Sequence, residues 1–399
     1  MKALFFAVVS TSLSTVAVTA QCPFSGLLRG FNVSSLMHPH PSHSNEPIQG
    51  AEGKNRDSVA NASDPFAAYR DYYYTFSELP PELDVRRRSL QQSSCGINMQ
   101  PPTLPRSQLQ LSSTRTDYND YVLAVYDEFV KEASASNPTF TPAGAVRIAF
   151  HECIPTNQFA PGRGGSRGDI GDELNMGPNG RLGFTFTRIL SLINTRKFGS
   201  ITVADAIHIT ALVAIQAYGG PKYQIPIGRP TDFTNADICP NPSICWPPPD
   251  FPQGNPITAL SGFIQHMYST AGFTNAVQAV AVSSGAHTLG GNRLNGGFDW
   301  TTDPYVFNNQ YHQTVMNWWN AGGPNPGGFQ FLQSLGLSTN GCPITMFHSD
   351  MMLGDPTLPF RPFTEKYASN QTAFYEDFVS FLQQCSVTGV KDPSLLVMP

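Results

Sequence analysis

The chain has 399 residues, enough for one large domain or two modest ones with a substantial core. Its net charge of −5, with only 13% charged residues, gives no electrostatic case for binding nucleic acid. With 34 glycines and 34 prolines, the composition suits a globular secreted protein with long ordered loops.

The first 20 residues predict a secretory signal peptide. A lysine at position 2 precedes a short apolar run, and Val18, Thr19 and Ala20 form a small-residue cleavage site. The run is too short for a membrane anchor, and no later segment approaches a spanning length. A mildly apolar first strand is the alternative interpretation. We therefore expect a secreted, extracellular protein with no membrane partner.

Residues 21–112 lack sustained periodicity and are rich in Ser, Pro, Asn and Arg, which predicts a disordered or loosely attached leader. Within it, the basic triplet 86–88 is typical of sites that processing proteases cut, so a propeptide would end near residue 88. Its removal would also remove Cys22 and leave six of the seven cysteines.

Six cysteines are enough for three disulfides. Cys239 with Cys245 is one candidate pair, and Cys342 with Cys385 is another, although the sequence does not decide either. The N-x-S/T sequences that predict a glycoprotein are weak signals that require surface exposure. They occur at Asn32, Asn61 and Asn370.

Residues 113–390 predict a mostly α-helical domain, followed by a tail at 391–399. Expected helices cover 117–134, 180–194, 260–270, 276–283, 310–319 and 365–385. Pro142 opens a further helix, and Thr202 caps another that the pair Gly219-Gly220 ends. Strand signals are few, and there is no internal repeat.

The sequence RIAFHEC carries the clearest chemistry. Arg147 and His151 lie four residues apart, so a helix projects both from one face. A neutral imidazole beside a guanidinium suits cleavage of a peroxide O–O bond, because one group takes a proton and the other stabilises charge on the departing oxygen. Asn179 can accept Nδ1–H and leave Nε2 free as a base. A lone histidine, by contrast, is usually structural.

These residues resemble the haem peroxidase superfamily of plants, fungi and bacteria. Its distal motif, an arginine, two residues, an aromatic and a histidine, matches Arg147, Phe150 and His151. The later asparagine matches Asn179, and the glutamate six residues before it matches Glu173. The resemblance implies a mostly α-helical, two-lobed fold with haem b between a distal and a proximal lobe.

The proximal side is similar to the same family. AVSSGAHTLGG resembles the haem-ligand motif, which makes His287 the axial iron ligand, and Asp350 resembles the aspartate that holds its other nitrogen. FDWTTDPYVFNNQY looks like the branch of ascorbate and cytochrome c peroxidases. There Trp300 would lie against His287 and donate its indole N–H to Asp350; ordinary core packing is the alternative. Arg293 would meet a haem propionate or be solvated.

The same run resembles a proximal site for one Ca²⁺ or K⁺ ion. The hard-oxygen ligands that the resemblance implies are Thr288, Thr301, Asp303, the Val306 carbonyl and Asn308. Asn308 stands where an aspartate is common, which leaves the ion open. Glu152 replaces the aspartate that secreted relatives carry after the distal histidine, so a distal Ca²⁺ is doubtful. An altered site from Glu152, Asp169 and Asp172 stays open.

Two specialised branches of the family are not matched. Phe140, Gly144 and Arg293 stand where manganese-oxidising relatives place acidic residues, and Val282 stands where ligninolytic relatives expose a tryptophan. We therefore expect a secreted, monomeric haem peroxidase that uses hydrogen peroxide to oxidise a small-molecule electron donor in one-electron steps. The alternative is a peroxidase-fold binding or structural protein that has lost catalysis.

Overall fold

The computed structural model describes residues 99–136, 138–154, 165–174, 179, 182–196, 198, 201–231, 257–292, 298–322, 336, 338–342, 344, 346–390 and 392–399. The chain divides into two units, Met1–Pro65 and Phe66–Pro399, and every described residue belongs to the second. The predicted signal peptide, the predicted leader up to residue 98, the candidate pair Cys239–Cys245 and Arg293 lie outside the described residues.

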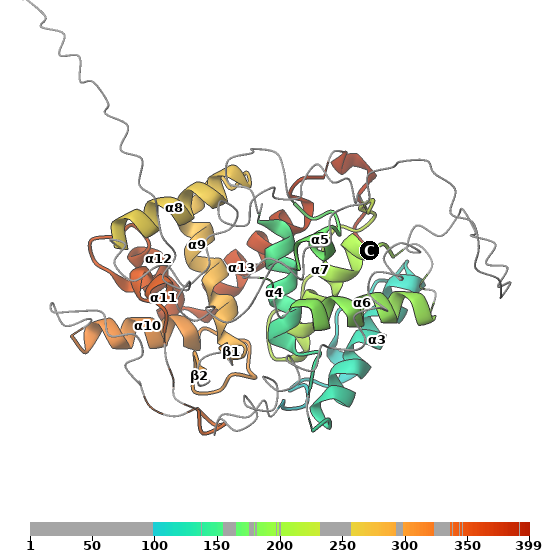
Figure 1. Cartoon of the computed structure of the whole chain (residues 1–399), viewed down its shortest axis with the longest axis horizontal. Helices are drawn as coiled ribbons and strands as arrows, with labels where there is room; N and C mark the ends of the chain where they lie inside the picture. The colour runs from blue at the N-terminus through green and yellow to red at the C-terminus, as the bar shows by residue number, and fades with distance from the viewer. Residues whose placement is uncertain are drawn as a thin grey trace, which may run out of the picture. The chain divides into compact units, whose positions relative to one another are not determined.

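The described part of the chain is mostly α-helical, as the sequence predicts (Figure 1). Its longer helices are α3 Thr116–Ala133, α4 Pro142–Cys153, α6 Leu182–Arg196, α7 Val203–Ala217, α8 Ile257–Thr270, α9 Ala276–Ser284, α10 Gln310–Asn320, α12 Arg361–Ser369 and α13 Gln371–Val387. Short helical turns are α5 Ile170–Glu173, η6 Gly285–Thr288, α11 His348–Met351 and η7 Met352–Gly354. The strands β1 Gly291–Asn292 and β2 Phe298–Asp299 pair antiparallel. None of the described helices has the length and apolarity to cross a membrane.

Local sequence signals start two of the central helices. Thr141 caps α4 by accepting a hydrogen bond from the backbone N–H of Gly144, and Pro142 occupies the first turn, where no intrahelical donor is needed. Thr202 caps α7 in the same way, accepting from the N–H of Asp205. Every residue of α7 is buried, which makes this helix a central packing element.

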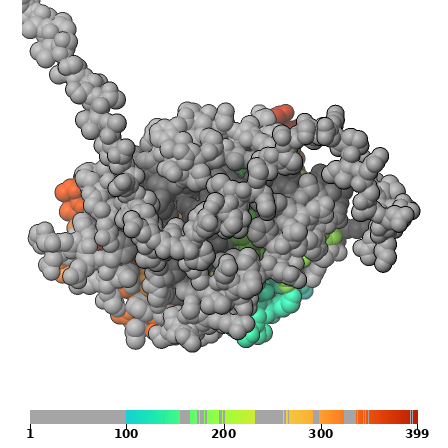
Figure 2. Space-filling view, in the orientation of Figure 1, coloured from blue at the N-terminus to red at the C-terminus, as the bar shows by residue number. Residues whose placement is uncertain are grey.

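The helices form two groups. In the first, α7 packs against α3, α4 and α6; in the second, α9, α10, α12 and α13 are joined by contacts of α12 with α10, α13 and α9. Helix α4 connects the groups by contacting α13 and η6, and it lies near the centre of the view (Figure 1). Part of α3 is visible as the teal patch in the space-filling view (Figure 2). Val130 of this helix is exposed.

The single helix expected at 365–385 is wrong. The structure has two helices, because α12 ends at Ser369 and Asn370 adopts an extended conformation with φ −139° and ψ 97°. The Asn370 side chain then accepts a hydrogen bond from the N–H of Ala373 and so caps α13. No glycine or proline stands between residues 363 and 388 to mark the break in the sequence.

Residues 99–112 pack on the helical body. The N–H of Leu104 donates to the carbonyl of Ala217, and Tyr126 Oη donates to the carbonyl of Leu104. The N–H of Gln110 donates to the side chain of Gln216. This end of the predicted leader is therefore hydrogen-bonded to α3 and α7.

A disulfide joins Cys153, the last residue of α4, to Cys385 in α13 across 232 residues of sequence. The candidate pair Cys342–Cys385 is therefore wrong, although Cys342 is disulfide-bonded as well. The Cα atoms of Cys153 and Cys385 lie 5.3 Å apart, and both residues are fully buried. The bond ties the two groups of helices together beside His151.

We expect loss of this disulfide to lower the free energy of unfolding by about 2–5 kcal/mol, because a long loop in the unfolded chain is released. Denaturant unfolding of Cys153→Ala, Cys385→Ala and the double variant measures the effect. If the bond is the cause, the double variant loses little more than either single variant. Additive losses would contradict the pairing.

Candidate active site

Helix α4 places Arg147 and His151 on one face, one turn apart. Arg147 Nε lies 3.4 Å from His151 Nε2, to which it donates a long hydrogen bond. His151 Nδ1 lies 2.5 Å from the side-chain oxygen of Asn179, so Nδ1 carries the proton and Nε2 is the basic nitrogen. The predicted contact between His151 and Asn179 is present.

The surroundings of His151 keep its ring neutral. Burial and the neighbouring Arg147 charge lower its pKa to about 3, while the hydrogen bond to Asn179 acts in the opposite direction. The Phe150 ring lies at 5.7 Å from the His151 ring, edge to face. Glu173 is the last residue of α5, and its side chain lies outside the described part.

The second histidine lies in η6, the turn that follows α9. His287 Nδ1 lies 2.8 Å from Asp350 Oδ1, and Asp350 itself is buried at the start of the short helix α11. The His287 side chain keeps 35% of its surface exposed, although Val282 and Thr288 around it are buried. With Nδ1 engaged, Nε2 is the nitrogen left for a ligand.

Trp300 lies flat against His287, as predicted. The two rings are 4.0 Å apart with an angle of 6° between their planes. The predicted hydrogen bond from Trp300 to Asp350 is wrong, because Trp300 Nε1 is buried without a hydrogen-bond partner in the described structure. Asp350 instead accepts from Tyr311 Oη and from the N–H of Phe347. The sequence interpretation missed Tyr311, although it ends the FDWTTDPYVFNNQY run.

Several of the predicted cation ligands lie together beside His287. The Thr288 hydroxyl donates to the Val306 carbonyl at 3.3 Å and lies 3.2 Å from Asn308 Oδ1. The Thr301 hydroxyl donates to the Thr288 carbonyl at 3.3 Å. Asp303 lies in the same loop, where its carboxylate accepts the N–H of Tyr305. The oxygens of Thr288, Thr301, Val306 and Asn308 are thus joined in one hydrogen-bonded group.

Glu152, next to His151, binds backbone N–H groups of a neighbouring loop. Its buried carboxylate accepts the backbone N–H groups of Arg167 (2.8 Å), Gly168 and Ile170 (3.0 Å). Asp169, from the same loop, pairs with Arg167 at 4.0 Å. Because N–H groups and a cation compete for the same lone pairs, this geometry disfavours Ca²⁺ at Glu152. Among the described residues, no cluster of three or more His, Cys, Asp or Glu side chains is arranged to hold a metal.

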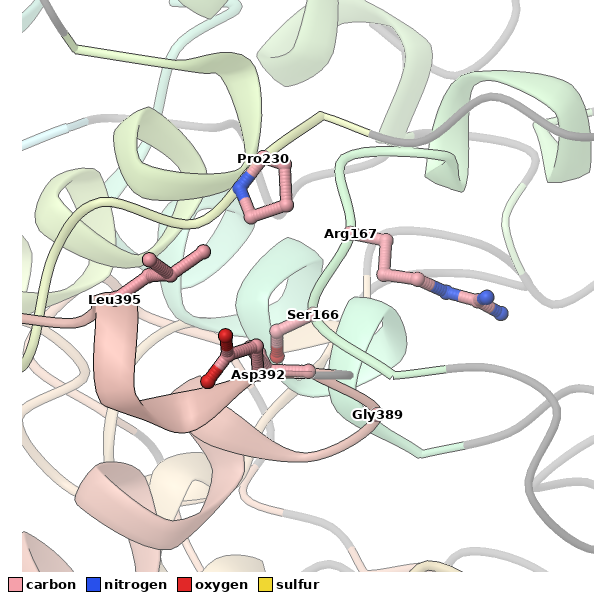
Figure 3. Close-up of a pocket in the computed structure, with 7 residues that line it drawn as sticks. Ser166, Arg167, Pro230, Gly389, Asp392 and Leu395 are labelled. Carbon is pink, nitrogen blue, oxygen red and sulfur yellow. The ribbon is translucent and has the colours of Figure 1, made fainter.

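A small cavity of about 190 Å³ lies beside the loop that holds Glu152. Its lining residues are Ser166, Arg167, Pro230, Gly389, Val390, Asp392 and Leu395. The Arg167 side chain points away from the other labelled residues (Figure 3). Ser166 Oγ is hydrogen-bonded to His208 Nε2 at 2.7 Å and donates to the Cys385 carbonyl. The lining contains none of the predicted catalytic or haem residues, so the cavity is separate from the candidate active site.

A family model described as "Peroxidase" matches residues 126–370, more than half of the chain. The chain belongs to the peroxidase family. This peroxidase is 29% identical to a putative heme-binding peroxidase of Mycosarcoma maydis over 61% of this chain and 72% of the relative. It is 26% identical to Peroxidase 41 of Arabidopsis thaliana (73% and 87%) and 27% identical to a mitochondrial cytochrome c peroxidase of Emericella nidulans (69% and 72%). The family binds haem and uses hydrogen peroxide with a reducing substrate.

We expect buried histidines to lower the stability of the peroxidase in acid. Burial lowers the pKa of His312 to about 3, and both its ring nitrogens lack hydrogen-bond partners in the described structure. An unfolded histidine takes up a proton below about pH 6.5. The unfolded state therefore binds more protons between about pH 6.5 and 3, and the free energy of unfolding falls as the pH falls through this range.

We expect His312→Gln to flatten this dependence, because glutamine has no proton to take up. Denaturant unfolding at several pH values between 4 and 8 measures the slope of the unfolding free energy against pH. The variant should have a smaller slope than the parent below pH 6 and the same slope near pH 8. Equal slopes below pH 6 would contradict the assignment of a neutral, buried His312.

Proposed function

We propose that this peroxidase holds haem b through His287 Nε2 and cleaves hydrogen peroxide with Arg147 and His151. The observation that carries the proposal is a pair of histidines on contacting elements, α4 and η6, each with Nδ1 bonded to a side-chain oxygen. Each imidazole is thereby oriented with Nε2 as its active atom. A structural histidine has no need of this matched arrangement.

The residues around His287 fit haem. The imidazole is accessible within a buried surround, and its Nδ1 hydrogen bond to a carboxylate strengthens it as an iron ligand. The flat Trp300 ring supports its face. Arg293 is proposed to meet a haem propionate, and Glu173 to support Asn179 from the end of α5.

Haem held there would supply the redox chemistry that breaks the peroxide O–O bond. His151 Nε2 would accept a proton from one peroxide oxygen and deliver it to the other, which leaves as water. Arg147 stabilises the negative charge that grows on that oxygen. Asn179 keeps the other ring proton on Nδ1, so Nε2 stays available throughout. Phe150 limits the space beside the imidazole.

Two donor molecules each give up one electron to complete the cycle. With a phenol as the donor, each also gives up one proton, so one hydrogen peroxide and two phenols yield two waters and two phenoxyl radicals. Phe140 stands where manganese-oxidising relatives carry an acidic residue, and Val282 stands where ligninolytic relatives expose a tryptophan. Both side chains are buried, so neither specialised donor site has its residue here. We therefore propose small-molecule donors that react at the haem edge, with phenols as the class to test first.

We also propose one proximal Ca²⁺ or K⁺ ion, held by oxygens of Thr288, Thr301, Asp303, Val306 and Asn308. The backbone N–H groups that Glu152 accepts disfavour a distal Ca²⁺. We further propose that the protein is a secreted monomer. Its leader would be removed near residue 88, and a helical domain at 113–390 would be followed by a tail at 391–399. The buried Cys153–Cys385 disulfide supports an oxidising compartment. The exposed position of Asn370 is compatible with glycosylation there.

A panel of donors tests the substrate proposal. The purified, haem-loaded protein is supplied with hydrogen peroxide and, separately, a phenol, Mn²⁺ or ascorbate, and donor oxidation is followed optically. We expect peroxide-dependent oxidation of the phenol and none of Mn²⁺. Oxidation of Mn²⁺ or ascorbate in preference to phenols would overturn the proposed donor class.

A further inference from the structure

Two side chains share one oxygen of Asp350. His287 Nδ1 lies 2.8 Å and Tyr311 Oη 2.6 Å from the same atom, Oδ1, while Oδ2 accepts the N–H of Phe347 at 2.8 Å. Tyr311 is fully buried in the first turn of α10, and Asp350 is 1% exposed. Because water is excluded, these three donors determine the charge that Asp350 presents to His287.

Trp300 does not contribute to this hydrogen bonding. Its ring covers the face of His287, yet its N–H has no partner in the described structure. The Tyr311 ring meets the His287 ring edge to face at 5.6 Å, with its hydroxyl directed at the carboxylate. The polar contact predicted for Trp300 is thus made by a tyrosine from another element.

Hydrogen bonds to one carboxylate oxygen compete for its negative charge. The Tyr311 hydroxyl withdraws charge from Oδ1, which leaves less to attract the Nδ1 proton of His287. The Tyr311 hydroxyl donates to Oδ1 at 2.6 Å, which is a short, charge-assisted hydrogen bond. Without this donor, Asp350 would pull the His287 proton more strongly and make the imidazole more anionic.

We infer that Tyr311 is a positioning residue that limits the anionic character of His287 by sharing Asp350 Oδ1. The inference rests on the proposed function, in which His287 is the iron ligand. A less anionic ligand stabilises ferric iron less, so Tyr311 keeps the reduction potential of the bound haem higher than the His287–Asp350 pair alone would set it.

Tyr311→Phe in the haem-loaded protein tests the inference, because it removes one hydroxyl and keeps the ring. We expect a lower ferric/ferrous reduction potential and a higher iron–histidine stretching frequency in the ferrous protein. Tyr367→Phe is the matched control. Tyr367 is also fully buried and donates to a carboxylate, Asp377, at 2.9 Å, but that carboxylate does not contact His287 in the described structure.

The control should leave both the potential and the stretching frequency unchanged. Equal shifts in the two variants, or no shift in Tyr311→Phe, would overturn the inference. If Tyr311→Phe does not fold, 3-fluorotyrosine incorporation provides the second test, since fluorination makes the phenol a stronger donor. The labelled parent protein should have a higher reduction potential than the unlabelled parent protein. An unchanged or lower potential would overturn the inference.

His287→Gly separates this inference from the proposed function. If the iron–histidine band persists in His287→Gly, His287 is not the ligand, and the proposed function fails together with the inference. If the band disappears in His287→Gly but is not shifted by Tyr311→Phe, the proposed ligand stands and only the role of Tyr311 fails.

Discussion

Replacing His151 with leucine is expected to lower kcat/KM for hydrogen peroxide by about 10²–10⁴-fold, the usual contribution of a positioned acid–base group. The side chain is buried, its Nδ1 proton is fixed by Asn179, and its pKa is lowered to about 3. A neutral base is therefore present at every ordinary working pH. Leucine fills similar space but can neither accept nor deliver a proton. Stopped-flow absorbance with peroxide measures the rate.

The variant His312→Gln is a suitable control for His151→Leu, because it replaces another buried histidine that is outside the proposed machinery. Its peroxide reactivity should match that of the parent, and both variants should retain bound haem. If His151→Leu reacted as fast as the parent, the proton transfer assigned to His151 would be wrong. The residues of the distal side would then serve binding or structure alone.

Replacing His287 with glycine should weaken haem binding by at least about 100-fold. Loss of a partner that only orients a metal ligand typically costs 10–100-fold in metal affinity, and loss of the ligand itself should cost more. Added imidazole should restore binding, since the cavity left by the side chain lies beside the intact Asp350. Haem titration followed by absorbance measures the affinity.

Asp350→Asn provides the graded comparison for His287→Gly. An amide can still contact His287 Nδ1 but carries no negative charge, so a loss of about 10–100-fold is expected. If His287→Gly bound haem as tightly as the parent, another residue would have to hold the iron. The proximal assignment would then be wrong, whatever the activity of the variant.

The geometry of the Arg147–His151 pair was predictable because its signals are local. Arg147 and His151 are one helical turn apart, and the Pro142 start signal places them on a helix. The capped start of α7 at Thr202 was predictable for the same reason. In each case, a spacing of a few residues decides the geometry.

The features that the sequence did not reveal depend on tertiary competition. The sequence offers both Trp300 and Tyr311 as donors to Asp350. The packing of α10 decides that Tyr311 makes the hydrogen bond, while Trp300 Nε1 has no partner in the described structure. Cys153 and Cys385 meet across 232 residues, which no local pattern encodes. The break at Asn370 depends on the extended backbone and the side-chain cap of this residue, and neither proline nor glycine marks it.

The most direct test of the central claim is a Soret titration of the purified, haem-loaded protein with hydrogen peroxide. If His287 holds the iron and His151 transfers the proton, one equivalent of peroxide should complete the spectral change. Two equivalents of a one-electron phenolic donor should then return the original spectrum. A protein that shows no Soret band, or whose Soret band does not respond to peroxide, would contradict the proposed site.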